Sequence, residues 1–337
     1  MVAFVLLVVA LLFSQPPAPA PAAPAALEKL RAEADALRPL VEHDCVRDFV
    51  GAVGVLPEVS PRVVYYQRDP KAAFSQEQAA KLPQEQRDKL TKLEFDTGKY
   101  YDTFYGSPLA YTRALEICAA AGLRAFDGRR IVDYGYGTCG HLRMLAAVGA
   151  DTTGVDVDPI LHVLYSQAGD QGKMPVGGRS GRGGTMHLVD GFWPGTPRVR
   201  DEVGAHYDLF ISKNTLKNGY VHPAQGVDKR RTLTLGVSDE EFVRVVFDTL
   251  NPGGLVMIYN IGPAPAPEGK PVIPWADIRC PFPRTMWEGA GFKVLEFEKD
   301  DKAAFLPYAK ALGWDKGDAP MDLEHDLFVS YTLARKP

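Results

Sequence analysis

The stretch Ile131-Val-Asp-Tyr-Gly-Tyr-Gly-Thr-Cys-Gly140 decides the fold. Two β-branched residues lead to Asp133, a glycine-rich run follows, and an apolar pattern resumes at Leu142. This order predicts a buried strand, a tight loop and a helix. Glycine in such a loop lets a bound ligand approach the backbone more closely than a Cβ would allow. The loop positions that we expect to face a ligand are therefore glycines, with Gly135 and Gly137 first among them.

The sequence around this stretch alternates short β-prone runs with helical patterns. The predicted strands are residues 130–133, 152–156, 185–189, 207–212, 254–261, 293–297 and 327–333. Asp158 and Pro159 are residue types favoured at an N-cap and at the first helical position, and Ser238 with Glu241 has the pattern of a capping box. This alternation indicates an α/β domain with a largely parallel sheet.

Length, charge and cysteine content argue against a nucleic-acid-binding protein, a metal site and a disulfide framework. The chain has 337 residues, enough for one α/β domain with additions or for two modest domains. Its net charge is -4, from 38 basic and 42 acidic residues, and no long basic run supports a nucleic-acid partner. The four cysteines are scattered without a CxxC pair, so we predict neither a metal site nor a disulfide framework.

The first 26 residues do not fit the pattern of the fold. Residues 2–13 are uninterrupted apolar, and residues 14–26 are only Ser, Gln, Pro and Ala. This arrangement resembles a secretory signal peptide and is short for a membrane span. However, the first basic residues, Lys29 and Arg31, follow the apolar run, which favours an anchor with the domain in the cytoplasm. The predicted location is therefore exported (periplasmic or extracellular) or membrane-anchored, and cytoplasmic if the start site is misassigned.

Residues 27–112 are interpreted as an N-terminal extension that packs on or over the main domain, residues 113–337. Residues 27–40 have the pattern of an amphipathic helix, and residues 73–93 are polar with helical propensity. The extension is therefore expected to be mostly helical. Three tyrosines at its end are candidates for a lid that lines a binding site: Tyr100, Tyr101 and Tyr105.

The glycine spacing fits more than one kind of ligand. Gly135, Gly137 and Gly140 match the G-x-G-x-x-G of dinucleotide-binding proteins. Asp133, two residues before the first glycine, would repel a pyrophosphate, but it suits a ligand with a protonated amino group, such as the methionine moiety of S-adenosylmethionine. Asp156 ends the next predicted strand, where a carboxylate can accept hydrogen bonds from ribose hydroxyls. Asp133, the position of the motif deep in the chain and the turn Leu250-Asn-Pro-Gly-Gly254 disfavour a nicotinamide dinucleotide.

From about Tyr100 to its end, the chain resembles the class I S-adenosylmethionine-dependent methyltransferases. The resemblance rests on an ordered set of features: the loop with Asp133, then Asp156, then Asp190, then residues 212–214, then the turn at 250–254. It implies a doubly wound, mostly parallel seven-stranded sheet with an antiparallel last strand. It also implies S-adenosylmethionine as cofactor and methyl transfer to an acceptor, for which a small molecule is favoured over a macromolecule.

The resemblance assigns cofactor binding to Asp133, Gly135, Gly137, Cys139, Asp156, Asp190 and Ser212, with Cys139 a departure from the usual small residue. Candidates for catalysis lie in the polar and aromatic segment after the fourth strand: Asn214, Tyr220 and His222. The imidazole of His222 titrates near neutrality and could act as a general base. Two alternatives stay open, a non-catalytic module that binds S-adenosylmethionine and an NAD-dependent oxidoreductase.

Overall fold

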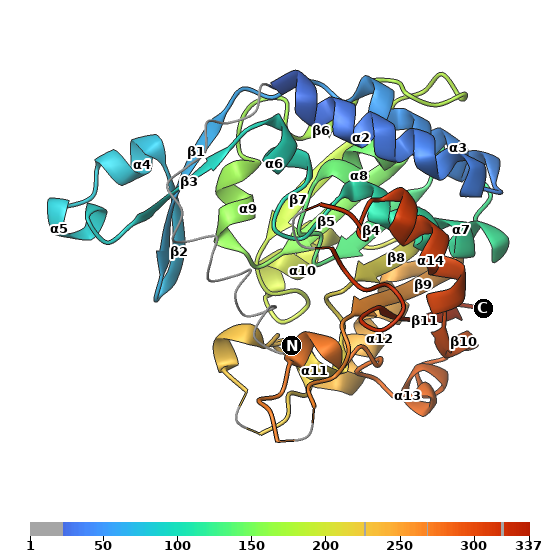
Figure 1. Cartoon of the computed structure of the whole chain (residues 1–337). Helices are drawn as coiled ribbons and strands as arrows, with labels where there is room; N and C mark the ends of the chain where they lie inside the picture. Colours follow the sequence, from blue (N-terminus) through green and yellow to red (C-terminus); the bar gives the residue numbers. More distant parts are fainter. Residues whose placement is uncertain (1–22, 226, 268, 318–319) are drawn as a thin grey trace.

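An eight-stranded sheet forms the centre of the structure (Figure 1). In spatial order its strands are β10 (Lys293–Asp300), β11 (Phe328–Arg335), β9 (Leu250–Gly262), β8 (Tyr207–Lys213), β4 (Arg130–Tyr134), β5 (Asp151–Asp156), β7 (Thr185–Asp190) and β6 (Gly172–Lys173). The pairs from β9 to β7 are parallel, whereas β11 is antiparallel to both β9 and β10. The predicted seven-stranded sheet with an antiparallel last strand is confirmed, and the short antiparallel β6 extends one edge.

The computed structural model describes residues 23–225, 227–267, 269–317 and 320–337. Residues 1–22 of the predicted leader lie outside these ranges. Within them, no helix combines the length and the apolar character that a membrane crossing requires.

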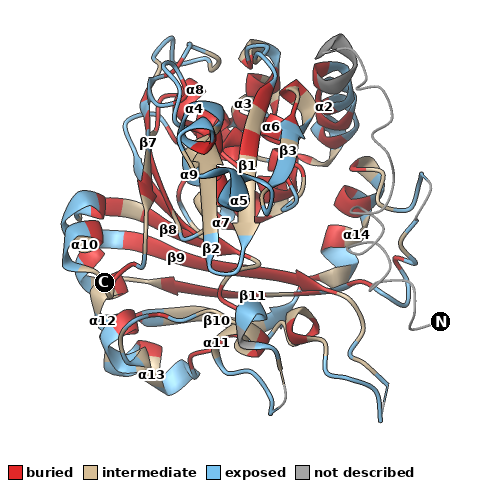
Figure 2. Cartoon of the chain, turned by 90° about the vertical axis from the view of Figure 1, so that its left-hand side faces the viewer, coloured by how far each residue is buried: buried red, intermediate tan, exposed pale blue. Residues whose placement is uncertain are grey.

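Helices cover both faces of the sheet, so the fold is doubly wound (Figure 2). Along β9, Leu255 and Met257 belong to one apolar cluster, and Val256 and Ile258 belong to the other, as the alternation of side chains along a strand requires. The first cluster includes side chains of α7 (Thr112–Ala120), α8 (Gly140–Ala147), α9 (Pro159–Leu164) and α14 (Lys302–Ala311). The second includes side chains of α10 (Pro197–Val203), α12 (Asp239–Thr249) and α13 (Arg284–Gly289).

The N-terminal extension is less helical than predicted. It contains α2 (Ala23–Leu37), α3 (Asp44–Gly51) and α6 (Thr97–Tyr101), with the 3-10 turns η1 (Arg38–Leu40), η2 (Ala52–Val55) and η3 (Pro108–Tyr111). It also contains an antiparallel sheet in the order β2 (Lys71–Ser75), β1 (Arg62–Arg68), β3 (Thr91–Phe95). The short helices α4 (Gln76–Ala80) and α5 (Gln84–Arg87) connect β2 to β3 and project from the main body (Figure 1). The helical propensity of residues 73–93 predicts a helical region there, but the ends of this segment pair with β1 as strands β2 and β3.

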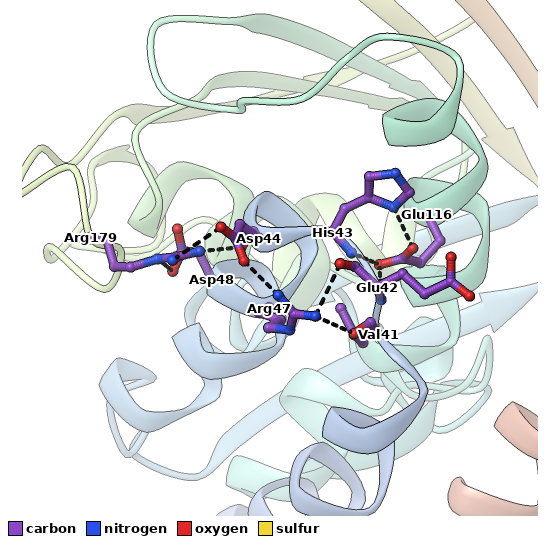
Figure 3. A network of polar contacts seen from close by, with 8 residues as sticks. All are labelled: Val41, Glu42, His43, Asp44, Arg47, Asp48, Glu116 and Arg179. Carbon is purple, nitrogen blue, oxygen red and sulfur yellow. Dashed lines mark hydrogen bonds and ion pairs between the residues drawn. The ribbon is translucent and has the colours of Figure 1, made fainter.

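Polar contacts fix α3 to the main domain (Figure 3). The buried carboxylate of Glu116 on α7 accepts the backbone N–H of His43 at 3.1 Å, and the ring Nδ1 of His43 lies 2.7 Å from its other oxygen. On the other side of α3, Arg179 of the glycine-rich loop 177–184 donates to Asp48 at 2.8 Å. These contacts hold α3 against α7 and against the loop 177–184, and they bind this loop arginine to protein carboxylates.

A buried ion pair joins the three-stranded sheet to the segment after α9. Arg62 of β1 donates to both carboxylate oxygens of Asp170, at 2.5 and 2.8 Å, and also to the carbonyl of Leu164. Tyr100 donates its hydroxyl to the same carboxylate at 2.8 Å. The side chains of Arg62 and Asp170 are 8% and 3% exposed. Each charge therefore depends on the other to offset the free energy that it loses when it is removed from water.

Replacing Arg62 with methionine should destabilise the fold strongly. The variant leaves the Asp170 carboxylate buried without a cation, which typically costs about 3 kcal/mol or more of unfolding free energy. Equilibrium unfolding in urea measures this loss. The control is Lys81→Met, which removes an exposed pair with Glu77 and should leave the midpoint unchanged. Equal midpoints for the Arg62 variant and the parent would contradict a structural role for the buried pair.

Candidate functional site

The glycine loop connects β4 to α8 at the edge of the sheet where the parallel strands end. Gly135 and Gly137 have φ angles of +77° and +57°, a region that glycine adopts without strain. The backbone N–H of Gly135 donates to the carbonyl of Val155 at 2.8 Å, and that of Gly137 donates to the carboxylate of Asp156 at 3.1 Å. The loop is thus fixed against the end of β5.

Protein side chains lie directly against both glycines. A Cβ added to Gly135 would lie 2.2 Å from Oγ1 of Thr215, and one added to Gly137 would lie 2.7 Å from Cβ of Tyr105. The sequence-based reason for these glycines, room for a ligand, is therefore corrected. In this structure the space is used by two covering segments, and a ligand that touches the loop must lie beside them or displace them.

Asp156 binds three backbone N–H groups at the end of β5. Its carboxylate accepts from Val157 at 2.7 Å, from Asp158 at 3.0 Å and from Gly137 at 3.1 Å. Burial nevertheless raises the pKa of Asp156 to about 6, against the effect of these hydrogen bonds. Because an ionised carboxylate offers about four acceptor positions, roughly one remains for a ligand hydroxyl.

Asp190 ends β7 next to Asp156 in the register of the sheet. It helps to line a cavity of about 470 Å³ between α9 and β7, together with Tyr136 of the glycine loop. Two apolar side chains follow these strand ends and are exposed, Val157 by 40% and Phe192 by 49%. Exposed apolar groups beside carboxylates at adjacent strand ends are typical of a site that a partly apolar, partly polar ligand covers.

Of the three predicted lid tyrosines, only Tyr105 lies at this edge. Its side chain is 53% exposed, and its hydroxyl donates to the Asp158 carboxylate at 2.6 Å. Tyr100 and Tyr101 are fully buried, and Tyr101 donates its hydroxyl to the carbonyl of Pro57 at 2.8 Å. The prediction that these two rings line the site is therefore corrected: they pack in the apolar cluster that the extension shares with the main domain.

Asp133, at the end of β4, is completely buried in a polar group. One oxygen, Oδ2, accepts the Tyr111 hydroxyl at 2.7 Å and lies 2.5 Å from Nε2 of His141. The His141 ring stacks on the Tyr111 ring with centroids 3.7 Å apart, and burial lowers the pKa of His141. The other oxygen, Oδ1, has no hydrogen-bond partner among the described residues. Sequence reasoning missed Tyr111 and His141, although a histidine directly after the glycine loop, at the start of the predicted helix, was a usable signal.

Lys213 ends β8 beside this group and is 8% exposed. Its Nζ lies 5.2 Å from the centroid of the Tyr111 ring, a cation–π contact. Within the described part of the chain, this ammonium makes no hydrogen bond and no ion pair. Burial lowers the pKa of Lys213 to about 8, opposed by the charges of Asp133 and Asp102.

Three predicted site residues have structural roles here. Ser212 is buried, donates to the carbonyl of Tyr134 at 3.0 Å and accepts from the N–H of Leu216. Asn214 has a φ of +66°, and its side chain accepts the N–H of Ile261 at 2.7 Å. Cys139 is fully buried, and burial raises the pKa of its thiol to about 11. Ser212 and Asn214 shape the turn after β8, and Cys139 packs in the core.

Tyr220 and His222 lie on and just after α11 (Asn218–Val221). His222 is paired with Asp239, with Nε2 2.9 Å from Oδ2, and both line a second cavity of about 420 Å³. None of the residues that line this cavity belongs to the glycine loop. Burial raises the pKa of Tyr220 to about 12, so its phenol stays protonated at neutral pH. The structure thus gives His222 an orienting carboxylate, but not a contact with the loop.

Lys217 is a second buried lysine, four residues after Lys213. It is 3% exposed, and its Nζ donates to the carbonyls of Ile261 and Trp275. Burial, together with the charge of Lys213, lowers the pKa of Lys217 to about 7. This ammonium links the start of α11 to the end of β9, a structural role that the sequence did not predict.

Comparisons with known proteins give only distant likenesses. No protein-family model matches this chain, and no curated protein matches it. Among solved structures, the [4+2]-cyclase SpnF has 18% identity and a TM-score of 0.40, over 67% of this chain and 80% of that one.

Two further solved structures carry the word methyltransferase in their names. A putative sarcosine dimethylglycine methyltransferase from Galdieria sulphuraria has 13% identity and a TM-score of 0.38, over 66% of this chain and 84% of that one. An S-adenosylmethionine-dependent methyltransferase from Thiobacillus denitrificans, in complex with S-adenosylhomocysteine, has 14% identity and a TM-score of 0.36, over 67% and 91%. At these scores, the likeness carries no conclusion about ligand or activity.

The lowered pKa of Lys217 should make the stability of the fold depend on pH. The pKa falls from its ordinary 10.5 to about 7 on folding. Between these values the unfolded chain binds more protons than the folded one, so the free energy of unfolding rises with pH, by up to about 1.4 kcal/mol per unit. In Lys217→Met this contribution is absent. Urea unfolding at several values between about pH 7 and 10 should show the parent gaining stability relative to the variant.

The matched control for this series is Lys173→Met, because Lys173 is exposed on β6. Its unfolding free energy should follow that of the parent at every pH. Parallel profiles for the parent and Lys217→Met would show that the folded chain does not lower the pKa of this lysine.

Proposed function

We propose that this chain binds S-adenosylmethionine at the edge of the sheet where β4, β5 and β7 end, and transfers its methyl group to a small-molecule acceptor. One observation carries the proposal. Three acids, Asp133, Asp156 and Asp190, lie at the ends of three adjacent parallel strands, and among the described residues one buried oxygen of Asp133 has no hydrogen-bond partner. A ligand that carries an ammonium group, a ribose and an amine-bearing base complements such a row.

The residues present fit the parts of this cofactor. The unpartnered Oδ1 of Asp133 would accept a hydrogen bond from the amino group of the methionine moiety. The remaining acceptor position of Asp156 would bind one ribose hydroxyl. The exposed apolar side chains of Val157 and Phe192 would contact the faces of the adenine, and Asp190 would accept from its amino group.

With S-adenosylmethionine bound, an acceptor would take the methyl group from its sulfonium by direct displacement, and S-adenosylhomocysteine would be the leaving group. The protein's part is to position the acceptor and to exclude water. Tyr105 is the residue suited to exclusion, because it lies against Gly137 and its hydroxyl holds Asp158. Tyr220, protonated at neutral pH, can donate a hydrogen bond to an acceptor rather than remove its proton. If the acceptor must lose a proton, the His222–Asp239 pair is the candidate base.

The same acids argue against a dinucleotide. The pyrophosphate of NAD would lie near the buried carboxylate of Asp133, and two like charges in a dry site repel each other strongly. A module that only binds S-adenosylmethionine differs from a methyltransferase in that it does not transfer the methyl group. Formation of S-adenosylhomocysteine with a panel of small acceptors, measured beside binding, separates these two functions.

Calorimetric titration of the full chain should show binding of S-adenosylmethionine and none of NAD. Phe192→Ala removes an apolar surface that would contact the adenine, so we expect affinity to fall about tenfold, or about 1.4 kcal/mol. The matched control is Phe328→Ala, because Phe328 is a comparably exposed phenylalanine, at 38%, on the antiparallel strand β11. No binding by the folded parent, or equal losses in both variants, would refute the proposed site.

The pH dependence of this binding tests Asp156 separately. Its pKa of about 6 means that the carboxylate becomes protonated as the pH falls through that value, and it then loses acceptor capacity. We expect the affinity of the parent to weaken between about pH 7 and pH 5 and to approach that of Asp156→Asn, whose affinity should change less. The exposed carboxylate variant Asp201→Asn should follow the parent. An Asp156→Asn profile that runs parallel to the parent's would exclude Asp156 from the binding site.

A further inference from the structure

Tyr111 is the centre of a buried polar group, which we call the Tyr111 cluster: Tyr111, Asp133, His141 and Lys213. The Tyr111 hydroxyl donates to Asp133, one side of its ring carries His141, and the same ring contacts the ammonium of Lys213. All four residues are less than one-tenth exposed. The cluster lies at the end of β4 and β8, under the extension, beside the site proposed above.

The cluster contains two charged atoms of opposite sign that do not satisfy each other. Asp133 pairs with Ile211 across the parallel strands, so Lys213, two residues further along β8, lies on the same face of the sheet. Nevertheless, Asp133 Oδ1 has no partner, and no ion pair joins it to Lys213 within the described residues. A buried carboxylate oxygen without a partner is costly, so Asp133 Oδ1 calls for a ligand, and the Lys213 ammonium, which forms no ion pair within the described residues, is available to the same ligand.

Neighbouring groups do not supply a hydrogen-bond acceptor to the ammonium of Lys213. The carboxylate of Asp102, whose charge reaches Lys213, is bound by Lys29 at 2.9 Å. The carbonyls of Ile261 and Trp275 serve Lys217 instead. The ring of Tyr111 offers only its π face. An anionic group of a ligand would supply the missing acceptor.

We propose that Lys213 binds the carboxylate of the amino-acid end of the ligand, while Asp133 Oδ1 binds its ammonium group. An amino acid carries these two charges on one carbon, and the Tyr111 cluster presents the two complementary charges on one face of the sheet. The inference rests on the proposed function, because it takes S-adenosylmethionine as the ligand. It makes Lys213 a specificity-determining residue, which recognises the amino-acid end of the cofactor rather than its nucleoside.

The test compares two ligands that differ only in the carboxylate. These are S-adenosylhomocysteine and its decarboxylated analogue, 5′-deoxy-5′-(3-aminopropylthio)adenosine, each titrated calorimetrically into the full chain. We expect the parent to prefer S-adenosylhomocysteine by about tenfold or more, since a charge-assisted hydrogen bond in a buried site is among the stronger ones. In Lys213→Met the preference should fall to about twofold or less, and in Lys213→Arg most of it should remain.

Lys173→Met, at an exposed lysine, is the matched control and should keep the parent's preference. Urea unfolding of each variant shows that it is folded. If the folded parent binds neither ligand, the proposed function and this inference fail together. If the parent binds both ligands but Lys213→Met keeps the parent's preference, the inference alone is overturned. A ratio of ligand affinities is insensitive to a general loosening of the site, so a merely structural role of Lys213 would not abolish the preference.

Discussion

The parallel pairing of β4, β5 and β7 is the constraint on which the site depends. In this register Asp156 lies directly beside Asp190, and Asp133 ends the strand that precedes them. Three acids are thereby brought to one edge of a sheet that is apolar on both faces. Like charges at short range raise the free energy of the folded state, so each acid needs its own compensation. Backbone N–H groups compensate Asp156, and Tyr111 with His141 compensates one oxygen of Asp133.

Two hydrogen bonds from tyrosine hydroxyls attach the extension to this edge of the sheet. Tyr111 comes from η3, immediately before α7, and Tyr105 comes from the turn after α6. Their hydroxyls donate to Asp133 and Asp158, respectively. The two covering contacts are thus made by neutral hydroxyl donors, which satisfy a carboxylate without adding a fixed positive charge. Because the extension is held by neutral hydroxyl groups, the negative charge at the strand ends stays available to a cationic ligand.

The sheet could be predicted from the sequence because its signals are local. The positions of seven strands along the chain follow from β-prone runs in an α/β alternation, whereas the antiparallel last strand was implied by the family resemblance. The N-caps at Asp158 and Ser238 are observed as expected. The small sheet of the extension was missed because residues 73–93 have helical propensity, and pairing with β1 is a tertiary effect that overrides propensity. The apolar run Val63–Tyr66 was the available signal.

The acids of the candidate site could be predicted, but their partners could not. Asp133, Asp156 and Asp190 follow from strand ends, which sequence patterns locate. Their contacts depend on residues brought in from distant segments, as with Tyr111 on Asp133. For the same reason, the sequence could not separate Tyr105, which lies on the loop, from Tyr100 and Tyr101, which are core residues. Adjacent tyrosines in one short segment look alike until the packing of that segment is known.

The charge states in the Tyr111 cluster follow from burial and lead to one further conclusion. Burial lowers the pKa of His141, which favours the neutral ring near pH 7 despite the adjacent Asp133 carboxylate. Lys213, with a pKa of about 8, stays largely protonated at that pH, whereas Lys217, with a pKa of about 7, is divided between its two forms. The cluster itself then holds one anion, Asp133, and one cation, Lys213, which do not bond to each other. A ligand with no net charge but two separated charges fits such a site better than a simple anion or cation, because either of those would leave one buried charge uncompensated.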